Sequence, residues 1–241
     1  MLKARGLFVK TCYILVSIGF SATVFLTSSK LGLLYLGLGL LINLVIVLLK
    51  YRNKILGFSM LLFVVFSTYY IANHTSKTAT YQRFEMSIDK FTNMEFKKES
   101  TESTEVRYFI WKSSVELLSN NFLFGVGTGD VIDELNEVYA ANGYKGALSR
   151  SFNPHNQYFQ TTIAIGVLGL TSLLVMFIYL FGQGIKHKKV IQIQFILMVS
   201  VFALTESILE RQEGIVFFTF FAFLFLQSKE NENSNQISHK S

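Results

Sequence analysis

Apolar residues gather along the chain in six blocks, each close to the length needed to cross a lipid bilayer. The blocks cover residues 9–27, 31–49, 55–72, 161–183, 190–206 and 214–228. A helix of about 20 apolar residues spans the hydrocarbon core of a membrane. The pattern predicts an all-α integral membrane protein. Residues 1–72 and 161–228 are each expected to form three transmembrane helices.

The long stretch between the third and fourth blocks, residues 73–160, carries several amphipathic patterns. Phe84, Ile88 and Phe91 recur at helical spacing, which predicts a short amphipathic helix, and a flexible connector is expected after it. Further on, an apolar face and a tryptophan favour a helix that lies on the membrane surface. This second helix carries Val106, Phe109 or Ile110, Trp111, Leu117 and Leu118. Residues 73–160 are therefore expected to fold as a small, mostly helical cap.

The segment "GVGTG" at residues 125–129 resembles phosphate-binding glycine loops only superficially. Those loops follow a β-strand and leave a helix N-terminus free, whereas a helical pattern precedes this segment and Asp130 follows it. We expect a tight turn that lets two helices approach closely. A helix is predicted over residues 131–141, with Asp130 as its N-cap and Asn142-Gly143 as its stop.

Composition supports a membrane protein and excludes some chemistry. The chain is 51% hydrophobic and 16% charged, whereas soluble domains carry about 25% charged residues. Its single cysteine, Cys12, excludes an intrachain disulfide and a metal site built from paired thiols. The four histidines, His74, His155, His187 and His239, are scattered along the chain, so no metal cluster is expected.

The net charge of +6 is distributed as an orientation pattern. Basic residues favour the cytoplasmic side of a membrane protein. This rule places both termini in the cytoplasm and the 73–160 loop outside. The loop is slightly acidic and shows no basic face, so nucleic acid is not an expected partner. The basic residues assigned inside are Lys3, Arg5, Lys10, Lys50, Arg52, Lys54, Lys186, Lys188, Lys189, Lys229 and Lys240, and the short outer loops hold Lys30 and Arg211.

The two ends of the chain have patterns of their own. The first block could instead be a signal peptide, but no small-x-small cleavage site follows it and five further blocks do. The polar segment at residues 229–241 is predicted to be a disordered cytoplasmic tail.

His155 and Asn156 are the strongest polar candidates, because they follow Pro154 and lie just before an apolar block. A neutral imidazole accepts a proton near pH 7, although a lone histidine is also often structural. The outward basic residues could grip phosphate or simply reach the membrane interface. They are Lys30, Arg83, Arg107, Arg150 and Arg211. Glu206, Glu210 and Arg211 form a further cluster, for which an internal ion pair is expected.

The order of these pieces resembles the O-antigen ligase and polymerase family of bacterial envelope glycosyltransferases. The pieces are "SSKLG" at 28–32, "VRYFIWKSSVELLSNNFLFGVGTGD" at 106–130, and "HNQYFQ" at 155–160 running into "IGVLGL" at 165–170. The resemblance implies a bacterial inner-membrane enzyme without metal or cofactor that takes a glycan from an undecaprenyl diphosphate carrier. The acceptor would be lipid A core, a growing polysaccharide or a protein.

The resemblance also implies roles for particular residues. His155 matches the family's loop histidine, as a general base or an acceptor-positioning group, and Asn156 beside it is expected to bind substrate. Arg107 matches an outer-loop arginine. Lys30 stands where the family usually has arginine, and a lysine keeps the charge but lacks the bidentate fork.

Two alternatives remain open at this point. The chain lacks several N-terminal spans usual in the family, so it corresponds to a C-terminal half: a fragment, a short member or part of a split enzyme. It could also be a non-catalytic membrane scaffold. A transporter is not expected, because the blocks show neither internal charges nor broken helices. The choice between ligase and polymerase also stays open.

Overall fold

The computed structural model describes residues 79–93 and 96–238, together with the single positions 37, 39 and 41. The described residues form helices, turns and coil, and include no strand. This confirms the all-helical prediction for that part of the chain. The chain divides into two units, residues 1–93 and 94–241, which are described separately. Lys30 and the three apolar blocks before residue 73 lie outside the described residues, apart from the three single positions.

In the first unit, the described helix is α4 (Ala79–Asn93). It confirms the helix expected around Phe84 and Ile88. The Ile88 side chain is exposed, and the amide of Asn93 donates to Asp89 one turn earlier, with 2.8 Å between Nδ2 and Oδ1.

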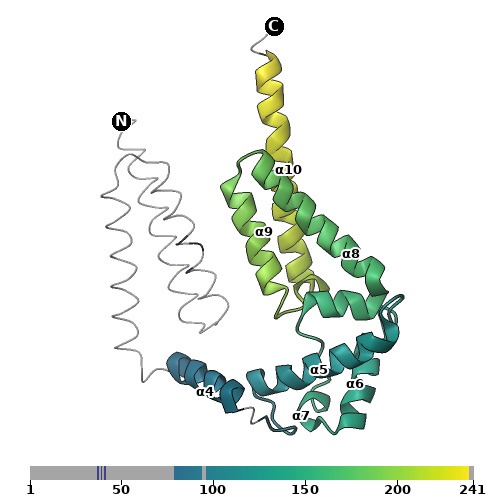
Figure 1. Cartoon of the computed structure of the whole chain (residues 1–241). Helices are drawn as coiled ribbons and strands as arrows, with labels where there is room; N and C mark the ends of the chain where they lie inside the picture. Colours follow the sequence, from purple (N-terminus) through teal and green to yellow (C-terminus); the bar gives the residue numbers. More distant parts are fainter. Residues whose placement is uncertain (1–36, 38, 40, 42–78, 94–95, 239–241) are drawn as a thin grey trace. The chain divides into compact units, whose positions relative to one another are not determined.

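The second unit begins with a helical cap made of α5 (Ser103–Asn121), α6 (Val131–Asn142) and α7 (Lys145–Leu148) (Figure 1). The apolar face of α5 is buried against α6, α7 and the start of α8. The prediction that this apolar face lies on the membrane is therefore wrong, because the face packs against other helices of the protein. The core of the cap consists of Val106, Phe109, Ile110, Leu117, Val131, Leu135, Tyr139, Tyr144, Ala147, Ile163 and Ala164.

The segment just before α5 was expected to be a flexible connector, but residues 96–102 are bonded to the cap. The amide of Gly146 donates to the carbonyl of Lys98 at 2.9 Å. The amide of Lys97 donates to Glu105 Oε2 at 3.1 Å. Glu102 then caps α5, since its side chain accepts from the amides of Thr104 and Glu105.

Helix α6 follows the sequence prediction closely. It begins directly after Asp130 and ends at Asn142, where Gly143 adopts a left-handed φ of 68° that glycine tolerates without strain. The side chain of Asp130 makes no capping hydrogen bond, so this residue occupies the N-cap position without acting as a cap.

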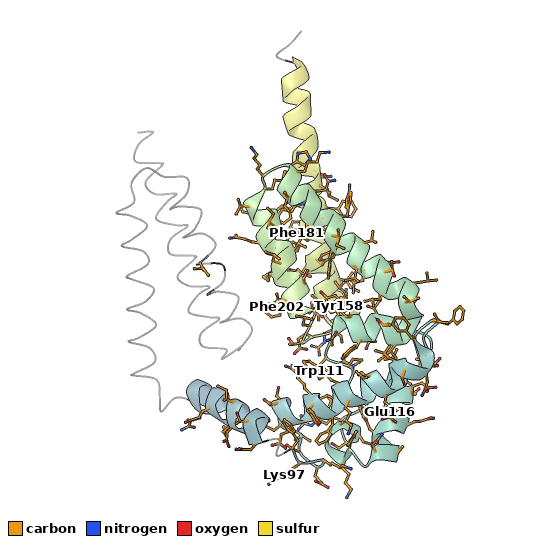
Figure 2. The ribbon with its side chains drawn as sticks, in the orientation of Figure 1. Lys97, Trp111, Glu116, Tyr158, Phe181 and Phe202 are labelled. Atoms are coloured by element: carbon orange, nitrogen blue, oxygen red, sulfur yellow. The ribbon has the colours of Figure 1, made fainter. Side chains whose placement is uncertain are left out.

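The rest of the second unit contains α8 (Gln157–Lys186), α9 (Val190–Phe202), the short 3-10 helix η1 (Ile208–Glu210) and α10 (Gln212–Ser238). Phenylalanine rings link three of the helices: Phe177 of α8 lies 5.9 Å from Phe218 of α10, which lies 6.1 Å from Phe195 of α9. Tyr158 and Phe202 mark one end of this bundle and Phe181 lies toward the other (Figure 2).

Within the described residues, α8 is the one helix long and apolar enough to cross a membrane. The apolar helices at 190–202 and 212–227 are shorter. They occupy the expected fifth and sixth blocks, but six spans are not confirmed. Helix α9 ends at Phe202, before the end of its block, because residues 203–205 form a turn.

Helix α10 continues to Ser238 and so includes most of the tail that was expected to be disordered. The difference has a simple physical basis. Adding a residue to an existing helix gains a hydrogen bond without a new nucleation step.

Helix α8 is broken at Gly166, whose φ of 71° and ψ of −160° are not helical. The expectation of unbroken helices is therefore wrong here. The glycine turn after α5 supplies the hydrogen bonds that the break removes. The amides of Val126 and Gly127 donate to the carbonyls of Ile163 and Ala164 at 2.8 and 3.1 Å, and the amide of Val167 donates to the Phe122 carbonyl at 2.9 Å.

The predicted tight glycine turn is thus confirmed, and α8 is the helix that it approaches. A Cβ on Gly125 would lie 2.6 Å from the Ala164 carbonyl carbon, and one on Gly166 would lie 2.2 Å from the Leu123 carbonyl oxygen. Both contacts involve backbone, so neither could be relieved by moving a side chain. The first part of α8 packs on the cap and the longer second part packs beside α9 (Figure 1).

Candidate functional site

Three separate segments meet at the carboxylate of Glu206. This residue follows α9, and its Oε1 atom forms an ion pair with the guanidinium of Arg107 on α5. Its Oε2 atom lies 3.2 Å from Nδ1 of His155, in the loop before α8. One carboxylate therefore brings together the histidine and the arginine that the sequence singled out.

The loop before α8 fixes the position of His155. Its φ of 45° is unusual for a residue other than glycine. Its amide donates to Oδ1 of Asn153 at 3.1 Å, a side-chain turn that stabilises this conformation. The indole of Trp111 donates to the carbonyl of Pro154 at 3.1 Å, and the Phe152 ring packs 5.4 Å from the imidazole. Strained backbone held by surrounding contacts is often found at functional sites.

Asn156 performs a structural task that the sequence did not assign to it. It is the N-cap of α8, and its Oδ1 atom accepts from the amides of Tyr158 and Phe159 at 2.9 and 3.1 Å. The side chain is buried. The side chain therefore acts as a cap that sets where α8 begins, directly after His155, and its contact with substrate stays a prediction.

The charges around Glu206 keep it ionised. Burial alone would raise its pKa, but the hydrogen bond with His155 and the positive charges of Arg107 and Arg211 lower the pKa below the ordinary value. An ionised carboxylate only accepts hydrogen bonds. The Nδ1 atom of His155 must therefore carry the proton that is shared with Glu206.

This arrangement determines what His155 can do. When Nδ1 carries the proton, the lone pair of a neutral imidazole is on Nε2. Among the described residues, Nε2 has no hydrogen-bond partner. His155 is thus set up to accept a proton at Nε2, next to the guanidinium of Arg107. A base beside a fixed cation suits reactions in which a hydroxyl loses a proton while negative charge develops nearby.

A second carboxylate, Glu210 in η1, belongs to the same region without touching the imidazole. Its Oε1 atom accepts from the amide of Gln160 at 2.6 Å, and its Oε2 atom accepts from Asn153 at 3.5 Å. Partial burial raises the pKa of Glu210, against the lowering effect of these bonds and of Arg211. The ion pair expected within the Glu206–Arg211 cluster is thus replaced by the longer-range pairing of Glu206 with Arg107.

The other predicted site residues are placed differently. Arg211 follows η1 and acts on both carboxylates through its charge. Arg150 is exposed on the turn after α7 and forms no ion pair with any described residue. Arg83 is on α4 in the first unit and its side chain is not described, and Lys30 lies outside the described residues. The structure therefore brings together His155, Arg107 and Arg211 from the predicted set.

Metal binding finds no support in this region. Among the residues that the structure describes, no three His, Cys, Asp or Glu side chains gather as metal ligands would.

Comparison with known proteins identifies a family over most of the chain. The family model described as O-antigen ligase matches residues 15–174, a range that includes Arg107 and His155 and ends before Glu206. No curated protein and no solved structure matches the chain significantly. Because the family match covers well over half of the sequence, the chain belongs to the O-antigen ligase family of bacterial inner-membrane proteins, whose members act on lipid-linked polysaccharides.

Proposed function

We propose that this protein transfers a glycan from an undecaprenyl diphosphate carrier to a hydroxyl group of an envelope acceptor. The acceptor is lipid A core, a growing polysaccharide or a protein. The protein would lie in the bacterial cytoplasmic membrane with both termini in the cytoplasm and residues 73–160 outside. His155 would be the general base, and Arg107 would bind the diphosphate.

The proposed reaction needs one proton acceptor and one cationic group. The acceptor hydroxyl oxygen attacks the anomeric carbon of the donor sugar and gives its proton to Nε2 of His155. The bond from that carbon to the diphosphate oxygen breaks, and its electron pair leaves with the lipid diphosphate. Arg107 stabilises the negative charge on the leaving oxygens. Arg211 would add to this positive field, and Lys30, Arg83 and Arg150 remain proposed contacts for other parts of the substrates.

The contact between Glu206 and His155 is the observation that supports this function most strongly. A carboxylate bonded to one ring nitrogen fixes the tautomer and stabilises the imidazolium that forms when the other nitrogen accepts a proton. The same carboxylate holds Arg107 alongside through one of its five N–H groups, so the remaining donors can face a diphosphate.

Replacement of His155 tests the catalytic proposal. In a strain lacking the gene, wild-type protein is expected to restore polysaccharide display. His155→Ala should lower the transfer rate by roughly 100- to 10,000-fold, because a general base contributes about that much. Transfer can be followed in membranes supplied with lipid-linked glycan, at matched protein levels. Substantial rescue by His155→Gln would make the residue an orienting group instead of a base.

His187→Ala provides a matched control, because it removes a histidine at the opposite end of α8. It should leave transfer close to the wild-type rate. Full activity of well-folded His155→Ala protein would contradict the proposal. The chain expressed alone is compared with a chromosomal segment that carries its gene and the neighbouring genes. If only the larger segment restores polysaccharide, the alternative of a non-catalytic scaffold or a partial subunit is favoured.

A further inference from the structure

The tip of the glycine turn exposes apolar side chains that nothing in the described part of the chain covers. Phe122, Leu123 and Phe124 follow α5, and the exposed fractions of Leu123 and Phe124 are 63% and 83%. Single exposed apolar residues are ordinary, but three consecutive ones at a turn are unusual for a surface in water.

Backbone hydrogen bonds tie this tip to the break in α8. The carbonyl of Phe122 accepts from the amide of Val167, and the amides of Val126 and Gly127 donate to the carbonyls of Ile163 and Ala164. The tip therefore stays at the height of Gly166 along α8. Exposed apolar side chains of that helix, Ile165 and Leu168, flank the break on both sides, and a Cβ on Gly166 between them would lie 2.2 Å from the Leu123 carbonyl oxygen.

The length of α8 beyond the break indicates where that height lies. The helical part from Val167 to Lys186 contains about 20 residues and is roughly 30 Å long, which matches the hydrocarbon thickness of a bilayer. Lysines follow at its far end, at Lys186, Lys188 and Lys189. If this part of α8 crosses the membrane, Gly166 lies at the other boundary of the hydrocarbon layer, and the part of α8 before Gly166 belongs to the cap.

We propose that Phe122, Leu123 and Phe124 insert among the acyl chains at this boundary and form a membrane anchor for the cap. The occupant of this apolar surface is lipid, because the tip is hydrogen-bonded to the helix that is long and apolar enough to cross a membrane. Aromatic and aliphatic side chains at a turn are well suited to this interface. The anchor holds the cap at a fixed height on the membrane, and it does not depend on the proposed glycan transfer.

Spin labelling tests the position of the tip. In a Cys12→Ser background, Phe124→Cys carries a nitroxide in vesicles of phosphatidylethanolamine and phosphatidylglycerol. Its collisions with oxygen, which concentrates in lipid, and with a water-soluble nickel chelate are measured. We expect the label to collide more often with oxygen than with the nickel chelate. A label on Leu168→Cys, whose native side chain is 70% exposed on α8, should behave in the same way.

Leu148→Cys is the matched control, because Leu148 is also an exposed apolar residue but lies on α7, which packs on α5 and α6. Its label should collide mainly with the nickel chelate. Leu123→Cys repeats the measurement if the label at position 124 disturbs the turn, since the Leu123 side chain also points outward. Labels at both tip positions that behave like the one at position 148 would overturn the anchor.

Discussion

At the scale of single residues, Glu206 carries two tasks at once. One oxygen pairs with Arg107 and the other accepts from His155. Loss of its negative charge would leave the guanidinium without its partner and would free the imidazole to exchange tautomers. Neither effect requires a change in fold, because Glu206 lies in a loop between α9 and η1 and over a third of its side chain is exposed.

We predict that Glu206→Gln lowers glycan transfer at least about 100-fold, comparable with loss of the base itself. An amide can donate a hydrogen bond to Nδ1 and so favour the tautomer that has no lone pair on Nε2. Initial rates in membranes, normalised to protein level, measure the effect. Glu206→Asp keeps the charge and should retain more activity than Glu206→Gln.

Glu210→Gln is the control for this prediction, because Glu210 bonds to Gln160 and Asn153 but not to His155 or Arg107. The neutral amide keeps an oxygen that can accept from Gln160. Its effect on the rate should be much smaller. Equal losses in the two variants would show that negative charge in this region matters, and not the contact with His155.

Sequence patterns identified His155 and Arg107, because residue type, position before an apolar block and family resemblance all point to them. They did not predict that Glu206 contacts both residues. That contact joins residues 51 and 99 positions apart, and no periodicity relates a carboxylate after one helix to a ring before another. The capping role of Asn156 was not predicted either, since a cap and a ligand contact use the same residue type.

At the scale of elements, α8 consists of two helical segments that are separated by the break at Gly166. The first part completes the core of the cap, and the second part belongs to the bundle with α9 and α10. The glycine turn makes this division possible, because it replaces the hydrogen bonds lost at Gly166. Its two positive-φ glycines and Gly166 itself occupy conformations that other residues rarely adopt.

We predict that Gly166→Ala destabilises the protein by at least about 2 kcal/mol. The backbone conformation of Gly166 is found almost solely in glycine and costs other residues roughly 1 to 3 kcal/mol. The added Cβ would also meet the Leu123 carbonyl oxygen. Thermal unfolding in detergent, followed through the fluorescence of Trp111, measures the change.

Gly182→Ala is the matched control in the second part of the same helix. Among the described residues, a Cβ there meets no atom within 4 Å outside its own stretch of helix, so the variant should gain up to about 1 kcal/mol from higher helix propensity. A Gly166→Ala protein as stable as the wild type would mean that α8 can run straight through without the turn.

The sequence predicted the glycine turn and the end of α6 because glycine and asparagine act locally. The break in α8 escaped prediction since "IGVLGL" is an ordinary apolar helix pattern, and the break depends on amides far earlier in the chain, those of Val126 and Gly127. The buried face of α5 was assigned to the membrane for a similar reason. Amphipathic periodicity shows that a face is covered, but not whether protein or lipid covers it.

At the scale of the whole molecule, the second unit separates its charges along the α8–α9 pair. Lys186, Lys188 and Lys189 lie at the connection between the two helices. The start of α8 and the end of α9 lie at the opposite end of the pair (Figure 1), and His155 directly precedes α8 while Glu206 follows α9. If α8 crosses the membrane, the lysines and the site therefore face opposite sides.

The proposed orientation places the site outside, and thiol labelling tests this in a Cys12→Ser background. Ser119→Cys, exposed near the end of α5 in the cap, should react with an impermeant maleimide in intact cells, after permeabilisation of the outer membrane where one is present. Lys186→Cys, exposed at the far end of α8, should react only after lysis. Basic residues resist transfer across the membrane, so the lysine-rich connection stays in the cytoplasm. The reverse labelling pattern would place His155 in the cytoplasm, where no extracytoplasmic acceptor could reach it. That result would contradict both the proposed orientation and the proposed transfer reaction.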